Sequence, residues 1–271
     1  MAAPVAPSVA APVEADARAA IPQRTLRTDR WWVTPAIYAV VLVGVVAYST
    51  WAAFQTTNYF AKPYISPFFS PCVASVCAKS GAPHVGIFGP WWGISPAIIV
   101  LIFPLGFRMT CYYYRRAYYR SIWLSPPACA VREPHRRYTG ETRFPLILQN
   151  IHRYFFFLLL FFNAILTYDA VVAFRDPHDH WGHMGFGTVM LVINALLLWS
   201  YSISCHSCRH VIGGRLKHFS RHPIRFKAWG FVSKLNARHM FFAWASLVFV
   251  ALTDLYVRLV ASGWITDPRF F

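Results

Sequence analysis

Charged side chains, and acidic ones above all, are scarce in this chain. Only 13% of the 271 residues are charged, and 10 Asp and Glu stand against 26 Lys and Arg. With 56% hydrophobic residues, this composition excludes an ordinary soluble domain of the same size. The chain also lacks a glycine-rich nucleotide loop of the usual kinds, a serine-nucleophile elbow and an internal repeat. The first two absences argue against a nucleotide-binding enzyme and a serine hydrolase, and the third argues against a repeat architecture.

What the chain has instead is long apolar runs. A helix needs roughly 20 apolar residues to cross about 30 Å of hydrocarbon, and strict alternation would mark a barrel strand. Five runs have the length without the alternation: Trp31–Trp51, Trp91–Tyr113, Phe144–Phe174, Gly185–Ser204 and Met240–Ala261. The sequence therefore predicts an all-α integral membrane protein, a five-transmembrane-helix bundle over residues 31–262. We expect residues 1–30 to form a disordered cytoplasmic tail and 263–271 an outer C-terminal tail.

The basic residues predict how this bundle is oriented. Most of them fall in residues 1–30, 108–145 and 209–238, which five spans place on one side of the membrane. Because cytoplasmic loops are rich in Lys and Arg, the N-terminus is expected in the cytoplasm and the C-terminus outside. The positive charge thus sets the topology in a bacterial plasma membrane and does not point to nucleic acid. It is also suited to contacts with membrane lipid headgroups or an acidic partner subunit.

Two cysteines lie in the predicted outer loop that follows the first span. Outside a bacterial plasma membrane, neighbouring thiols most simply form a disulfide, here between Cys72 and Cys77. Metal binding together with His84 is the alternative.

A dense group of potential metal ligands lies at the inner end of the fourth predicted span: Cys205, His206, Cys208 and His210. The predicted topology brings three more to the same depth: Cys111, His152 and His239. On a continuous helix, Cys205 and Cys208 share a face, whereas the two histidines between and after them point elsewhere. Either the helix breaks there, or the thiols combine with imidazoles from other helices, for which His152 and His239 are the natural candidates.

This ligand set allows several prosthetic groups. Two Cys and two His are the ligands of a Rieske-type 2Fe-2S cluster, and the same set also binds structural zinc. A haem b is the main competitor, with His152, His206 and His239 as potential ligands of one inner haem. The plain alternative is that the thiols are packed as small hydrophobic groups and the histidines satisfy helix ends.

The inner rim also has the character of a quinone site, which needs apolar walls and a few polar groups for the quinone carbonyls. An aromatic belt with inner arginines would place similar residues there. The candidates for binding the quinone are Tyr113, Arg116, Trp123, Asn150, Arg153 and Ser204. Asp169 and Asp254 lie near the outer helix ends. They are expected either to exchange protons with the outside or to be structural groups whose hydrogen bonds are satisfied at the helix ends.

Four segments resemble the membrane-anchor subunit of bacterial succinate dehydrogenase. They are residues 107–116, 143–154, 204–210 and 235–240, and the resemblance covers roughly residues 90–262. It implies a complex with a flavoprotein and an iron-sulfur subunit, in which electrons from succinate reach quinone, expected to be menaquinone, in this subunit. The chain is then part of an enzyme but supplies no catalytic residue for succinate and is inactive on it alone.

One feature departs from that family. Its five-helix anchors typically carry two b haems on four helix histidines, and this chain lacks histidines in its first two spans. The haem content is therefore open, and the cysteines make an iron-sulfur centre a candidate replacement. Two other functions compete: the b-type cytochrome subunit of another quinone oxidoreductase, and a Cys/His-gated metal transporter. The apolar run at residues 155–162 argues against the wet path of a transporter, and a higher oligomer is left open.

Overall fold

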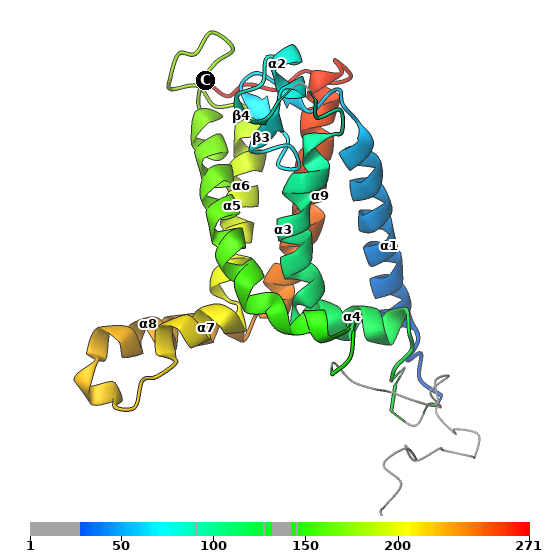
Figure 1. The fold of residues 1–271 in the computed structure, drawn as a ribbon, viewed down its shortest axis with the longest axis vertical. Helices are drawn as coiled ribbons and strands as arrows, with labels where there is room; N and C mark the ends of the chain where they lie inside the picture. The colour runs from blue at the N-terminus through cyan, green and yellow to red at the C-terminus, as the bar shows by residue number, and fades with distance from the viewer. Residues whose placement is uncertain (1–27, 90, 127, 130, 132–141, 145) are drawn as a thin grey trace, which may run out of the picture.

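The computed structural model describes residues 28–271 apart from 90, 127, 130, 132–141 and 145. Nearly all of the tail predicted at residues 1–30 lies outside the described residues. Long helices packed side by side form the body of the molecule (Figure 1). Four of them are long and apolar enough to cross a membrane: α1 (Val33–Phe54), α5 (His152–Val172), α6 (Phe186–Ile203) and α9 (His239–Ala261). The 3-10 helix η1 (Leu146–Ile151) leads directly into α5.

A fifth span depends on how one bent pair of helices is counted. Helix α3 (Pro96–Thr110) is followed by α4 (Tyr112–Ser121) at an angle of 75°. Helix α3 therefore begins later and ends earlier than the predicted span from Trp91 to Tyr113. The break lies at Cys111, whose backbone is extended (φ −66°, ψ 131°). Because α4 carries three arginines, its continuation into hydrocarbon would be unfavourable, and it lies across the end of the bundle (Figure 1).

The end of the bundle that holds α4 is here called the basal end. A second break follows α6, where Cys205 again has an extended backbone (φ −65°, ψ 145°). From there a side arm projects away from the bundle (Figure 1). The arm consists of α7 (His206–Gly213), η2 (Phe219–Arg221) and α8 (Pro223–Asn236).

The opposite end is covered by short elements and holds the C-terminus (Figure 1). These elements are β1 (Phe60–Ala61), β2 (Tyr64–Ile65), β3 (Cys72–Ala74), α2 (Val76–Lys79) and β4 (His84–Phe88). Strands β1 and β2 pair antiparallel, and β3 and β4 pair parallel. The predicted disulfide between Cys72 and Cys77 is confirmed, so these thiols are not available to a metal.

Buried polar bonds join this cap to the helices. Asp254 of α9 is fully buried and accepts hydrogen bonds from Arg258 Nε (2.8 Å), Tyr48 Oη (2.5 Å) and the Ser66 hydroxyl. Arg258 also donates to the carbonyl oxygen of Ala52 (2.9 Å). The network favours the reading of Asp254 as a satisfied structural group. Asp169 likewise accepts a hydrogen bond from a cap hydroxyl, that of Ser70.

Replacing Asp267 with alanine is expected to loosen the cap. Its carboxylate accepts hydrogen bonds from Tyr64 Oη (2.7 Å), Tyr256 Oη (2.6 Å) and Gly187 N (2.8 Å). The variant loses three hydrogen bonds to a charged acceptor, and their donors are left without a partner. We expect this to destabilise the protein by about 3 kcal/mol. The melting temperature of the purified complex should therefore fall.

The matched control is Asp179→Asn, because Asp179 has a left-handed backbone (φ 71°) that asparagine tolerates better than alanine. Asp179 pairs with Lys62 at 2.6 Å, but both side chains are exposed, so this ion pair contributes at most about 1 kcal/mol. Equal melting temperatures for the two variants would show that Asp267 does not hold the cap.

Candidate functional site

Two thiol–imidazole pairs lie in the core at the basal end. His152 Nε2 is 3.2 Å from Cys205 Sγ, and Cys111 Sγ is 3.6 Å from His239 Nε2. The two thiols come from the breaks after α3 and α6, and the two imidazoles from the first residues of α5 and α9. Cys111, Cys205 and His239 are almost completely buried. Four of the seven predicted ligands therefore lie in two thiol–imidazole pairs.

The second nitrogen of each imidazole has a hydroxyl partner. His152 Nδ1 lies 2.8 Å from Thr110 Oγ1, and His239 Nδ1 lies 2.7 Å from Ser204 Oγ. The carbonyl oxygen of Ser204 in turn accepts a hydrogen bond from Asn236 Nδ2 (2.7 Å). These bonds fix both rings with Nε2 directed at a sulfur. Ser204, predicted as a quinone ligand, here orients an imidazole.

Aromatic rings hold the two imidazoles from their faces. Phe107 stacks on His152 with a centroid distance of 4.5 Å and an interplanar angle of 15°. Tyr201 stacks on His239 at 5.1 Å and 16°, and Tyr113 meets the same ring edge-on at 5.1 Å. The site is thus rigid and largely closed to water.

A buried cation lies beside the thiols. Arg108 donates to Tyr114 Oη (2.5 Å) and Ser246 Oγ (3.1 Å), and its guanidinium lies 4.8 Å from the centre of the Tyr201 ring. These partners are all neutral, so Arg108 favours negative charge nearby. Burial, and then the neighbouring Cys111, raise the pKa of the Cys205 thiol to about 12. A metal ion that binds Cys205 would therefore have to displace its proton.

Other predicted ligands lie away from these pairs. On the arm, His206 Nε2 and His210 Nε2 are 3.0 Å apart and exposed. The half-buried Cys208 packs against the same core, and burial raises the pKa of its thiol. The structure thus places Cys205 with His152 and does not group it with Cys208. No group of three or more His, Cys, Asp and Glu suited to one metal ion occurs within the described residues.

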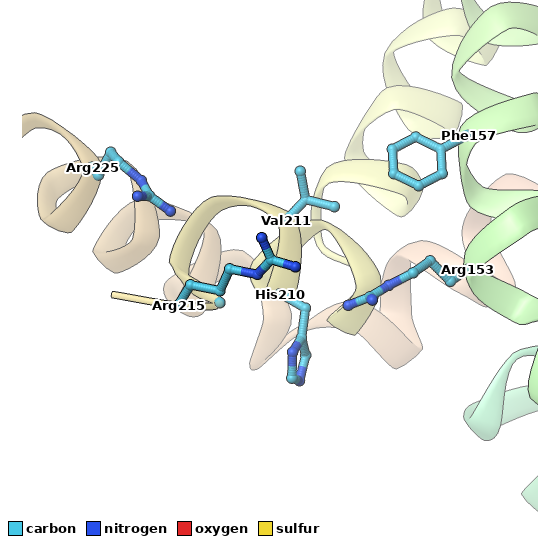
Figure 2. Close-up of a pocket in the computed structure, with 7 residues that line it drawn as sticks. Arg153, Phe157, His210, Val211, Arg215 and Arg225 are labelled. Atoms are coloured by element: carbon cyan, nitrogen blue, oxygen red, sulfur yellow. The ribbon is translucent and has the colours of Figure 1, made fainter. Parts of the chain in front are cut away.

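The candidate quinone ligands divide between two places. Tyr113 contacts His239, as described above, while Arg116 and Trp123 are exposed on or just after α4. Asn150 is exposed on η1, which packs against α3 and α5. Arg153 instead lines a cavity formed with α7 and α8 (Figure 2). Four of the six candidates therefore lie on or beside α4 and η1, apart from Arg153 and Ser204.

Comparison with known proteins agrees with this architecture. Residues 33–263 match the family model described as actinobacterial succinate dehydrogenase subunit SdhC. A chain of the Mycobacterium smegmatis Sdh1 complex in the apo form is 55% identical, with a TM-score of 0.85 over 94% of this chain and 97% of that one. None of the curated proteins matches. The chain therefore belongs to the actinobacterial SdhC family, as a multi-pass membrane-anchor subunit of a succinate dehydrogenase complex in the bacterial plasma membrane.

Proposed function

We propose that this subunit passes electrons from an iron-sulfur subunit to menaquinone through a Cys/His-ligated centre at its basal end. The observation that carries the proposal is the two adjacent thiol–imidazole pairs in a rigid, buried site. The flavoprotein and iron-sulfur subunits are expected to dock at the same end. Without them the chain has no group that oxidises succinate.

The charge distribution supports a cytoplasmic basal end. The arginines of α4 and the basic residues of the arm all lie there. If α3 and α4 count as one span, the chain crosses five times, with its N-terminus in the cytoplasm and its C-terminus outside.

The types of side chain present match the ligand set of a Rieske-type 2Fe-2S cluster. Cys111, Cys205, His152 and His239 would provide its two thiolates and two imidazoles. Thr110 and Ser204 bind the second imidazole nitrogens, as residues around metal-ligating histidines usually do. A bound cluster would supply one-electron transfer. Because no three of these side chains are grouped around one point in the described residues, they would have to shift to hold a cluster.

Haem b and zinc are weaker fits. A haem bound by His152 and His239 would leave two buried thiols beside its ligands without a role. Structural zinc takes the same four donors, but it has no redox chemistry and would not serve electron transfer. The two buried thiols beside the imidazoles therefore favour the cluster over a haem.

We infer that the quinone binds at the rim formed by α4 and η1. Tyr113, Arg116, Trp123 and Asn150 offer aromatic walls and polar groups for its carbonyl oxygens. Tyr113 also contacts His239, which links this rim to the buried site. Reduction of the quinone to quinol would take two electrons, which a bound centre would supply, and two protons from the cytoplasmic side.

The test is metal, sulfide and haem analysis of the purified native complex, with EPR of the reduced sample. We expect two iron atoms and two acid-labile sulfides beyond those of the soluble subunits, with a low average g value, as a 2Fe-2S centre with two His ligands requires. A haemochrome spectrum without the EPR signal of the cluster would show that the subunit binds haem b and not a cluster. Finding neither would contradict a redox centre in this subunit.

A further inference from the structure

A basic cavity of about 600 Å³ opens at the basal end, apart from the thiol–imidazole pairs. It lies where the first turns of α5 face α7 and the start of α8 (Figure 2). Three arginines line it, Arg153, Arg215 and Arg225, together with His210. None of its lining residues is acidic, so the cavity attracts anions.

A backbone carbonyl holds one of these arginines in place. Arg225 donates from Nε (3.1 Å) and Nη2 (2.7 Å) to the carbonyl oxygen of Ile212. Arg215 adopts a left-handed backbone (φ 74°), which is unfavourable for a residue with a Cβ. Its guanidinium lies over α7, and that of Arg153 points toward it from α5 (Figure 2). Three cations that line one cavity repel each other, and an anion bound between them would offset this repulsion.

The wall of the cavity nearest the bundle is apolar. Phe157 lies one turn further into the span than Arg153, and it is half exposed. Val211 of α7 is also about half exposed. The cavity therefore presents cations where α5 begins and apolar surface further along the span. A lipid has the same order of groups, with a phosphate followed by acyl chains.

We propose that this cavity binds an anionic phospholipid of the cytoplasmic leaflet. Its phosphate lies among Arg153, Arg215 and Arg225, and an acyl chain follows Phe157 and Val211. A free phosphate would leave the apolar wall unused, as would an acidic segment of a partner subunit. The proposal does not depend on the redox centre, and only the choice of leaflet follows from the proposed orientation.

The experiment is native mass spectrometry of the purified complex, titrated with phosphatidylglycerol, cardiolipin or phosphatidylcholine. In the double variant Arg215→Gln/Arg225→Gln, binding of the two anionic lipids should weaken about thirtyfold, because each basic residue at the membrane surface contributes about a factor of five. The double variant Lys217→Gln/Arg221→Gln removes the same charge from the same segment but not from the cavity. It should retain the affinity of the unmodified complex.

A second variant tests the proposal if the arginine variant does not assemble into the complex. Val211→Trp fills the cavity without changing its charge, and should reduce the binding of anionic lipid as the arginine variant does. Several results would overturn the proposal: equal losses in both charge variants, equal binding of phosphatidylcholine, or displacement of lipid by millimolar inorganic phosphate. A cryo-EM map of the complex with a protein segment in the cavity would also do so.

Discussion

Replacing Cys205 with alanine is expected to abolish electron transfer from succinate to a menaquinone analogue. The variant loses one of the four proposed ligands, the thiol that lies 3.2 Å from His152 Nε2. Replacing a residue that only supports a metal ligand typically lowers metal affinity or activity by about 10–100-fold. Loss of the ligand itself should therefore slow quinone reduction by more than about a hundredfold. Succinate oxidation with an artificial dye should persist, because that reaction uses the soluble subunits alone.

Cys208→Ala is the matched control. Cys208 lies three residues further along, is half-buried, and packs against the same core as Cys205. The Cys208→Ala variant should retain both quinone reduction and the EPR signal of the cluster. If Cys205→Ala retains quinone reduction, or if both variants lose it equally, the assignment of Cys205 as a ligand is wrong.

The largest effect on stability is expected for Asp254→Ala. This change leaves the guanidinium of Arg258 buried at 5% exposure without its carboxylate. Breaking a buried ion pair by removing one partner destabilises a protein by about 3–5 kcal/mol. The hydroxyl groups of Tyr48 and Ser66 lose their acceptor as well. We expect little assembled complex in membranes, measured by the yield of the subunit after affinity purification.

The double variant Asp254→Leu/Arg258→Met separates charge from packing. Replacing both members of a buried pair by apolar residues of similar size is often neutral. The yield should therefore recover well above that of Asp254→Ala. A double variant that assembles no better than the single one would show that the hydrogen bonds to Tyr48 and Ser66, and not the charge, hold α9 to α1 and the cap.

The spans could be predicted from hydropathy because lipid-facing residues leave long apolar runs. The bend at Cys111 could not, since residues 107–114 contain no proline or glycine and the run appears continuous to Tyr113. Arg108 was counted with the inner basic loop, yet it is buried in α3 against Tyr114 and Ser246. The strands of the cap have two to five residues, too few for a recognisable alternation.

The depth of the candidate site was predictable, but its pairing was not. Topology alone brings Cys111, His152, Cys205 and His239 to one level of the membrane. Which thiol meets which imidazole depends on the two extended residues at the helix breaks, Cys111 and Cys205 themselves. No sequence spacing points to Thr110 or to the role of Ser204, because their contacts with the imidazoles arise only when α3, α5, α6 and α9 pack together.

The pairing of Asp254 with Arg258 also bears on how the chain enters the membrane. In the proposed orientation, the end of α9 must be carried across the bilayer by the insertion machinery. An isolated charge in the helix opposes this, by at most about 2.5–3.5 kcal/mol, the cost at a helix centre. The two residues lie one turn apart on the same helix, so their charges offset each other before α1 or the cap is in place. Asp254→Ala would therefore impair biogenesis of the subunit as well as its folded state.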